Sequence, residues 1–100
     1  MDPTNFHFIP ERFAVQIGDR EIVLTPTQFR LLEVLESVPG RVFSRAELVK
    51  LAFAATVDER TVDVHIKELR RKLEPDDWRV RTVRGQGYCF RDEPAGGEAC

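Results

Sequence analysis

Cationic side chains are concentrated on one face of a predicted helix over residues 60–73. At about 100° per residue, this face carries Arg60, Val64, Lys67, Glu68 and Arg71. The opposite face is a narrow apolar stripe that recurs in steps of four, three and four residues, formed by Val62, Ile66, Leu69 and Leu73. A helix that packs through such a stripe and turns a cationic face outward is typical of a helix that lies in a nucleic-acid groove.

A basic hairpin is predicted after this helix. Residues 79–84, Arg-Val-Arg-Thr-Val-Arg, indicate a strand, and residues 88–90 indicate its returning partner. Between them, Gly85 and Gly87 permit a tight turn and a close approach of the backbone to DNA. Arg84 at the tip suits a narrow minor groove, and Thr82 can add a hydrogen bond to a phosphate. Helix and hairpin predict double-stranded DNA binding, with the helix (about 59–73) in the major groove and the wing (about 79–90) at the minor groove.

Several helix positions are candidates for direct contact with DNA. Arg60 and Thr61 begin the helix, where reader helices approach bases and phosphates. Val64 is an apolar residue within a polar face, and it would gain contact against a thymine methyl group. Lys67 and Arg71 lie one turn apart and are expected to contact phosphate or guanine, because arginine suits bidentate guanine recognition and lysine suits a point-charge contact.

Two acidic residues belong to the same helix. Glu68 has two interpretations that stay open: it accepts a hydrogen bond from a cytosine amino group, or it pairs with Lys72 one turn later. Asp63 is expected to be structural and to pair with Lys67 or Arg70. The base preference of this chain is therefore expected to depend in part on Glu68.

His65 and Arg45 complete the candidate DNA contacts. His65 lies at the edge of the apolar stripe, where it either forms a hydrogen bond within the fold or contacts a phosphate. Arg45 is expected to contact the DNA backbone from the preceding helix. We expect no catalytic site, metal or cofactor, because no nucleophile arrangement is present and His7 and His65 are far in sequence from Cys89 and Cys100.

The positive charge is local, although the net charge of the chain is −2. Residues 1–59 hold six Lys and Arg against nine Asp and Glu, residues 60–84 hold eight against five, and residues 85–100 hold one against three. The predicted helix and hairpin thus form a cationic patch on an otherwise acidic chain, which is the pattern of a surface that binds nucleic acid.

The length of 100 residues fits one domain. We expect a disordered N-terminus over 1–5, a domain over 6–92 and a flexible tail over 93–100. No apolar run is long enough to span a membrane and no signal peptide opens the chain, so a cytoplasmic protein is expected. Two cysteines do not make a disulfide framework, and both are expected to be reduced.

Short strands are predicted before the helices. Residues 6–9 indicate one strand, and the alternation of Phe13, Val15 and Ile17 places these three side chains on one face of the next. Gly18-Asp19 is a turn signal, and residues 21–24 indicate the returning strand. The N-terminus is therefore expected to form an antiparallel sheet.

Three helices are predicted between this sheet and the hairpin. Thr25 and Ser44 each open a capping box, and Asp58 is a plausible cap for the third helix. The second helix is expected to bury Leu48, Leu51 and Ala52. The fold class is α+β: a winged helix-turn-helix with an N-terminal antiparallel sheet, three helices and a C-terminal β-hairpin wing.

Four ordered motifs make the chain resemble the effector domain of OmpR/PhoB-type winged-helix response regulators. They are Leu-Thr-Pro-Thr-Gln-Phe (24–29), Pro-Gly-Arg-Val-Phe-Ser-Arg (39–45), Arg-Thr-Val-Asp-Val-His-Ile (60–66) with Leu-Arg-Arg-Lys-Leu (69–73), and Arg-Thr-Val-Arg-Gly-Gln-Gly-Tyr (81–88). The resemblance implies a transcription regulator of a two-component system, usually attached to a phosphorylated receiver domain. Since the chain begins directly before the sheet, we expect either an excised domain or a regulator without a receiver.

The resemblance also implies partners. It suggests head-to-tail pairing of two domains on direct-repeat half-sites, and RNA polymerase as a second partner through the loop before the third helix. That loop spans only residues 54–59 here and is shorter than in many family members. The alternative is a winged-helix module that binds another protein without specific DNA binding, since a fold alone does not fix a function.

Overall fold

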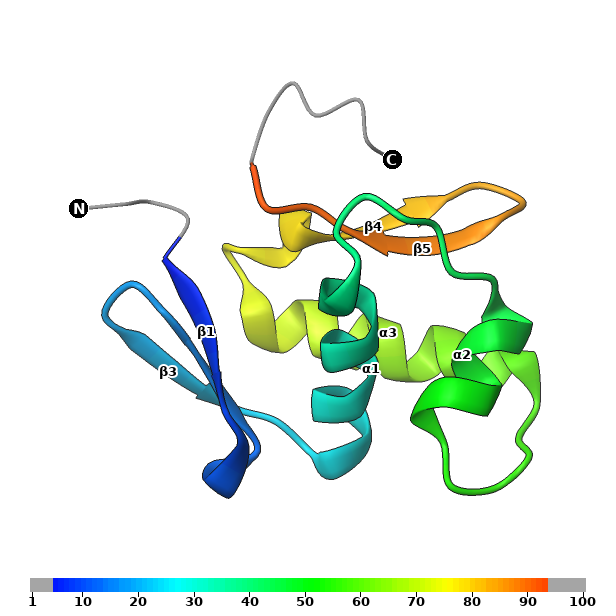
Figure 1. The fold of residues 1–100 in the computed structure, drawn as a ribbon, viewed down its shortest axis with the longest axis horizontal. Coiled ribbons are helices and arrows are strands. Elements are labelled where there is room, and N and C mark those ends of the chain that lie inside the picture. The colour runs from blue at the N-terminus through cyan, green and yellow to red at the C-terminus, as the bar shows by residue number, and fades with distance from the viewer. Residues whose placement is uncertain (1–4, 94–100) are drawn as a thin grey trace.

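The structure is a computed structural model that describes residues 5–93. Its strands and helices follow the expected order: β1 (Phe6–Ile9), β2 (Ala14–Ile17), β3 (Arg20–Val23), α1 (Pro26–Ser37), α2 (Arg45–Ala52), α3 (Glu59–Leu73), β4 (Val80–Val83) and β5 (Gly87–Phe90). The N-terminal sheet lies on one side of α1 and α2 lies on the other, while α3 runs behind α1 and the β4–β5 hairpin crosses the top (Figure 1). This arrangement confirms the predicted α+β winged helix-turn-helix. The expected flexible ends fall mostly outside the described residues.

The N-terminal sheet is antiparallel, with strand order β1-β2-β3. Gly18, at φ +59°, turns the chain from β2 into β3 as expected. Val15 and Ile17 are buried, but Phe13 is 45% exposed, so the prediction that it shares their face is wrong. Phe13 ends a short 3-10 turn at φ +51°, and β2 begins only at Ala14. The alternation of a strand therefore does not extend back to Phe13.

The first helix begins and ends where the sequence predicts. Thr25 and Gln28 form the capping box, because each side chain accepts a hydrogen bond from the other residue's backbone N–H at 3.1 Å. Pro26 occupies the first turn, and α1 ends before Pro39. The buried face of α1 supplies the centre of the core, with Phe29, Leu31, Leu32, Val34 and Leu35.

The second helix also has its capping box, between Ser44 and Glu47. Leu48 and Ala52 are buried as expected, but Leu51 is 44% exposed, and the prediction that it is buried is wrong. Leu51 lines a surface groove with Val38 and with residues of α1. A helix of eight residues touches the core along a narrow stripe, so this leucine falls at its edge.

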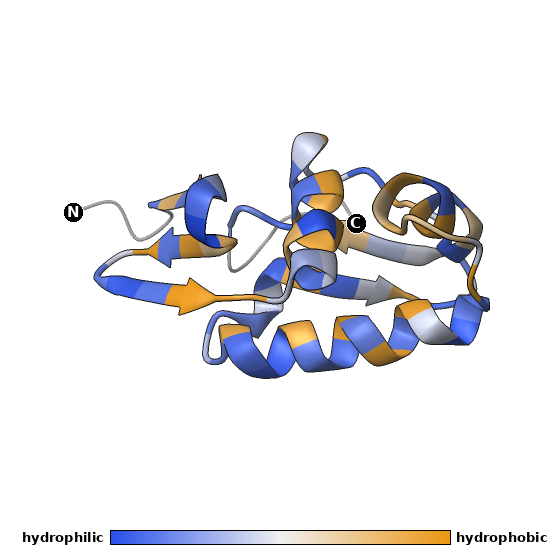
Figure 2. Cartoon of the chain, turned by 90° about the horizontal axis from the view of Figure 1, so that it is seen from below, coloured by the Kyte–Doolittle hydropathy of each residue, from blue (hydrophilic) through white to orange (hydrophobic). Residues whose placement is uncertain are grey.

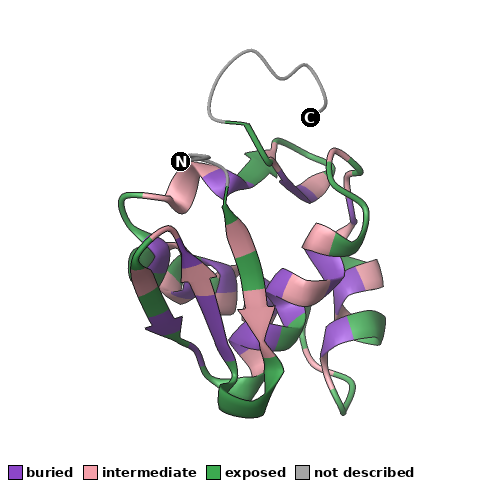
Figure 3. Ribbon diagram, turned by 60° about the vertical axis from the view of Figure 1, so that its left-hand side comes forward, coloured by how far each residue is buried: buried purple, intermediate pink, exposed green. Residues whose placement is uncertain are grey.

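One core joins the sheet, the three helices and the hairpin. Its buried residues lie along the inner faces of these elements (Figure 3). Cys89 is fully buried in β5 and is disulfide-bonded, so the expectation of reduced cysteines is wrong for this residue. Within residues 5–93, no helix has the length and apolar character that crossing a membrane requires.

Candidate nucleic-acid interface

The third helix is built as the sequence predicts. Asp58 caps it, since its carboxylate accepts a hydrogen bond from the Arg60 backbone N–H at 2.8 Å. Cations in the last turn complement the negative end of the helix dipole, and the helix ends two residues before Pro75. Its predicted apolar stripe is almost completely buried, at 0–1% exposure: Val62, Ile66, Leu69 and Leu73. Apolar and polar residues alternate along α3 accordingly (Figure 2).

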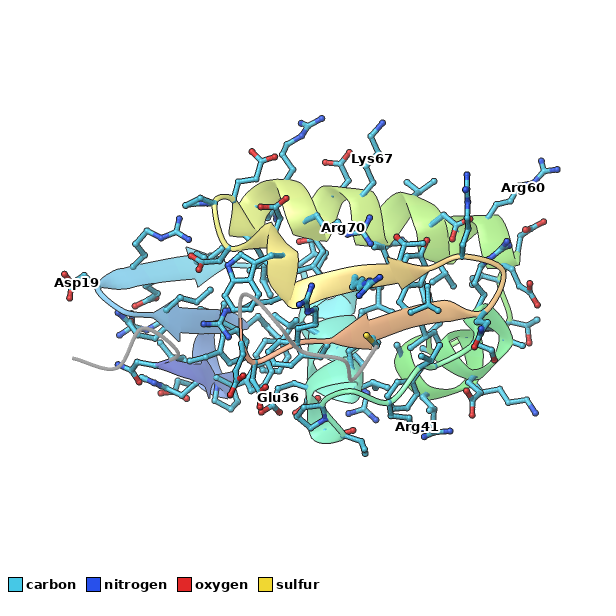
Figure 4. All side chains as sticks on the ribbon, turned by 90° about the horizontal axis from the view of Figure 1, so that it is seen from above. Asp19, Glu36, Arg41, Arg60, Lys67 and Arg70 are labelled. Atoms are coloured by element: carbon cyan, nitrogen blue, oxygen red, sulfur yellow. The ribbon has the colours of Figure 1, made fainter. Side chains whose placement is uncertain are left out.

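The opposite face of α3 is open to solvent. Arg60 and Lys67 extend away from the rest of the molecule (Figure 4). The Arg71 side chain is 69% exposed, and Val64 is 60% exposed between these cations. The structure therefore brings these four predicted DNA contacts together on one surface, which we call the outer face of α3.

Glu68 lies beside this outer face with its side chain 44% exposed. Its nearest cation is Arg71, three residues later, with 3.9 Å between Oε1 and Nη1. In the structure Glu68 therefore pairs with Arg71, and not with Lys72 as one of the two interpretations expects. A pair this long and this exposed contributes little stability, so Glu68 stays available to a base.

Thr61 and His65 lie at the margin between the core and the outer face, and both are partly buried. The His65 ring meets the Phe53 ring edge to face, with 5.4 Å between centroids. This contact agrees with His65 as a boundary residue, although it leaves the ring nitrogens available to a phosphate.

The β4–β5 hairpin forms the predicted wing. Val83 pairs with Gly87, and the Gln86 N–H donates to the Val83 carbonyl at 2.9 Å, which closes the tip around Arg84 and Gly85. Gly85 has φ +74°, and Arg84 is exposed. Arg79, counted in the sequence as part of the basic strand, is fully buried and does not belong to the cationic surface.

Thr82 already has a partner within the protein. Its hydroxyl oxygen accepts a hydrogen bond from the Arg70 guanidinium, whose Nε also donates to the Val80 carbonyl at 2.9 Å. The Thr82 hydroxyl keeps its own proton, so donation to a phosphate stays a prediction. Arg70 links α3 to β4, a role that the sequence did not indicate.

Asp63 is structural, but with partners other than those predicted. Instead of Lys67 or Arg70, it accepts a hydrogen bond from the Tyr88 hydroxyl at 2.6 Å. Burial, and next the hydrogen bond to Asp63, raise the pKa of Tyr88 to about 12, so its hydroxyl is a donor at neutral pH.

Arg45 lies beside the same carboxylate. Its guanidinium is 3.6 Å from Asp63 and 3.7 Å from Glu59, and its side chain is 44% exposed. The predicted contact of Arg45 with the DNA backbone would therefore compete with two acidic neighbours.

A cleft of about 380 Å³ separates α3 from the wing tip. Its walls are formed by Glu59 and Asp63 of α3, by Arg45 of α2 and by the wing residues 82–88. Among residues 5–93, no cluster of three or more His, Cys, Asp or Glu side chains could hold a metal ion.

Comparison with known proteins gives a consistent result. A family model described as "Transcriptional regulatory protein, C terminal" matches residues 19–90. The phosphate regulon transcriptional regulatory protein PhoB of Rhizobium meliloti is 51% identical over 84 residues, covering 78% of this chain and 36% of the relative. PhoB of Escherichia coli is 42% identical over 85 residues, covering 81% of this chain and 37% of the relative. The chain thus spans little more than a third of these curated relatives.

Two solved structures have the same fold. The DNA-binding domain of the response regulator AdeR, solved in complex with an intercistronic region, has a TM-score of 0.78 and 31% identity over 87% of this chain and 94% of that domain. The Klebsiella pneumoniae RstA DNA-binding domain, in complex with the RstA box, has a TM-score of 0.77 and 30% identity over 93% of this chain and 97% of that domain.

Proposed function

Because this chain belongs to the family of C-terminal domains of transcriptional regulatory proteins, we propose that it binds double-stranded DNA in a sequence-specific manner. The outer face of α3 would enter the major groove, and the wing tip with Arg84 would lie at the minor groove. The observation that carries this proposal is the cationic outer face of α3, exposed along its length while the opposite stripe is buried.

Two kinds of contact would share the work. Arg60, Thr61, His65 and Arg84 would contact phosphates or the minor groove, which gives affinity and position. Val64 and Glu68 would contact base edges, which gives sequence preference, and Lys67 and Arg71 would contact a guanine edge or a phosphate. Thr82, Gly85 and Arg45 would add contacts to the DNA backbone from beside the cleft.

The test is a titration of the chain with duplex DNA at several salt concentrations, after selection of bound sequences from a random duplex pool. We expect affinity to fall with salt, and the Lys67→Ala variant to lower the slope of log affinity against log salt by about 1 if Lys67 contacts a phosphate. Lys50→Ala is the matched control, because Lys50 is exposed on α2, away from the outer face of α3. Affinity that neither falls with salt nor prefers any sequence would sink the proposal.

The same selection tests the arrangement on DNA. We propose that two copies bind head to tail, because one small domain makes few phosphate contacts and the resemblance implies direct-repeat half-sites. Selected sequences should then contain two direct repeats at fixed spacing. A palindrome or a lone half-site would contradict this arrangement.

The wider role is proposed for a longer protein. We propose that the chain is the effector part of a cytoplasmic regulator of a two-component system and that RNA polymerase is a second partner. The connector between α2 and α3, with Ala54, Ala55 and Thr56 exposed, is the surface proposed for that contact. Crosslinking from this connector to polymerase on promoter DNA tests it, and an unchanged transcript level after its replacement would contradict it.

The competing function is a protein-interaction module. It would be favoured if Lys67→Ala and Arg84→Ala left regulation intact while Val23→Ser, on the exposed side of the N-terminal sheet, abolished it. We favour DNA because the cations are gathered on α3 and the wing rather than on the sheet.

A further inference from the structure

We propose that Asp63 and Arg70 of α3 are positioning residues that hold the wing at a fixed angle to α3. Through them, Arg84 at the wing tip would reach DNA at the same time as the outer face of the helix. This inference rests on the DNA binding proposed above and adds residues that do not themselves need to touch DNA.

Arg70 ties α3 to β4. Its Nε donates to the Val80 carbonyl at 2.9 Å, and Nη2 donates to the Thr82 hydroxyl. Figure 4 shows Arg70 between α3 and the hairpin, whereas Lys67 points away from both. Within the described part of the chain, the backbone of β4 pairs only with β5, so the Arg70 side chain is what links β4 to the helix by hydrogen bonds. The planar guanidinium makes both bonds in one fixed geometry.

Asp63 ties the same helix to β5. It lies seven residues before Arg70, about two turns, so both side chains leave α3 on nearly the same side. Its carboxylate accepts the Tyr88 hydroxyl hydrogen bond at 2.6 Å, and Tyr88 is only 8% exposed. The Arg70 guanidinium also lies over the Tyr88 ring, 5.5 Å from its centroid. One tie therefore holds each strand of the hairpin.

The position of these ties along the hairpin explains their effect. The backbone of Tyr88, near the tip end of β5, is also held, since Phe43 and Tyr88 exchange two backbone hydrogen bonds of 2.8 and 3.0 Å. Beyond Thr82 and Tyr88, the tip is closed by its own turn bond from Gln86 to Val83. A change of angle at the ties would therefore move Arg84, two residues past Thr82, without unfolding the core.

The charges of the pair also fit this role. Asp63 would repel a phosphate, but it is bonded to Tyr88 and lies 3.6 Å from the Arg45 guanidinium. Arg70 is a cation that points toward the wing, where its guanidinium is hydrogen-bonded to β4. Asp63 and Arg70 thus both form hydrogen bonds with the wing, although they belong to the helix that faces DNA. Lys67 and Arg71 differ from them because they lie on the outer face of α3.

The experiment is a double-mutant cycle on DNA affinity with Arg70→Met and Arg84→Ala. Methionine keeps the length of the side chain and removes its donors. In the otherwise unchanged chain, Arg84→Ala should weaken binding about tenfold, and in the Arg70→Met background by only about twofold, since coupled residues are not additive. Arg71→Met is the matched control: it removes the same charge from α3, and Arg84→Ala should keep its full effect beside it.

Tyr88→Phe provides a second cycle without any change of charge. Tyr88→Phe removes the hydroxyl bonded to Asp63 and keeps the buried ring, so this variant is expected to fold. It therefore tests the proposal even if Arg70→Met does not fold. We expect Arg84→Ala to lose about half or more of its effect in this background too. Backbone amide order parameters at residues 83–87 should fall in Arg70→Met and Tyr88→Phe but not in Arg71→Met.

The outcomes separate this inference from the proposed function. If the unchanged chain shows no salt-dependent, sequence-specific binding, the proposed function fails. If it does bind, but Arg84→Ala costs the same in all backgrounds and the wing stays ordered, then DNA binding stands and the positioning role is refuted.

Discussion

Replacing Gly87 with alanine is expected to destabilise the domain far more than the same change at Gly85, although both lie in one wing. Gly87 has φ +147°, and an added Cβ would overlap the Phe43 carbonyl oxygen and lie 2.8 Å from its carbon and 2.9 Å from Ser44 Cα. Gly85 has φ +74°, and nothing lies within 4 Å of an added Cβ. Gly87→Ala thus produces a steric overlap with the backbone of Phe43 and Ser44, whereas Gly85→Ala produces none.

The magnitudes follow from these environments. Alanine at Gly85 would hold a side chain in the left-handed backbone conformation, which costs about 1–2 kcal/mol of stability. At Gly87 it adds about 1–3 kcal/mol of backbone strain and displaces β5 from Phe43. That displacement lengthens the two hydrogen bonds between Phe43 and Tyr88, each contributing about 0.5–1.5 kcal/mol. We therefore expect a loss of about 2–6 kcal/mol for Gly87→Ala, a large part of the stability of such a domain.

Thermal and urea unfolding, both followed by circular dichroism, measure both variants. For a domain of this size, each 1 kcal/mol lowers Tm by about 4–8 °C, so Gly85→Ala should melt somewhat below the unchanged chain and Gly87→Ala well below it. Equal losses for the two variants would refute the reasoning, because they would show that the contact of β5 with Phe43 does not constrain the wing.

Three other substitutions test further parts of the structure. Arg20→Met should cost about 1–3 kcal/mol, because the Arg20 guanidinium donates to the Leu73 and Glu74 carbonyls at 3.2 and 3.0 Å and to the Asp76 carboxylate at 2.8 Å, at the C-terminal end of α3. Chemical denaturation measures this loss, and an unchanged free energy of unfolding would contradict the capping role. Because the pKa of Tyr88 is raised from 10.0 to about 12, the stability that its protonated hydroxyl contributes is complete below pH 10 and is lost as pH rises toward 12. Unfolding free energies across this range should fall less steeply with pH in Tyr88→Phe than in the unchanged chain. Equal slopes would contradict a contribution of the Tyr88 hydroxyl to stability. Glu68→Gln should shift the preferred base at one position of the selected site from cytosine to adenine, since glutamine pairs with adenine; an unchanged selected sequence would show that Glu68 does not contact a base.

The sequence was sufficient wherever one local pattern determines one element. The capping boxes at Thr25 and Ser44 and the cap at Asp58 each depend on residues within three positions, and each begins a helix as predicted. The buried stripe of α3 follows from periodicity alone. Phe13 and Leu51 are exposed because they lie at the margins of elements, where periodicity does not say how far the core extends.

Contacts between distant segments carried no such signal. Arg20 and Asp76 are 56 residues apart, and Asp63 and Tyr88 are 25 apart. Charged residues on a helix have obvious partners one or two turns away, so the sequence favours Lys67 or Arg70 as the partner of Asp63. The seven-residue spacing of Asp63 and Arg70 was available as a hint of a shared side, but only the position of the hairpin shows what faces that side.

The third helix therefore has three functional sides rather than two. A helix docked only through an apolar stripe would leave every polar residue to solvent or to DNA, and each charge would count toward the binding surface. In this chain the wing occupies a third side, where Asp63 and Arg70 are already bonded. Lys67 and Arg71 are instead exposed and are among the cations that can meet DNA from the middle and end of α3. Base preference should consequently respond to substitutions at Val64, Lys67, Glu68 and Arg71, whereas substitutions at Asp63 and Arg70 should weaken binding to all sequences alike.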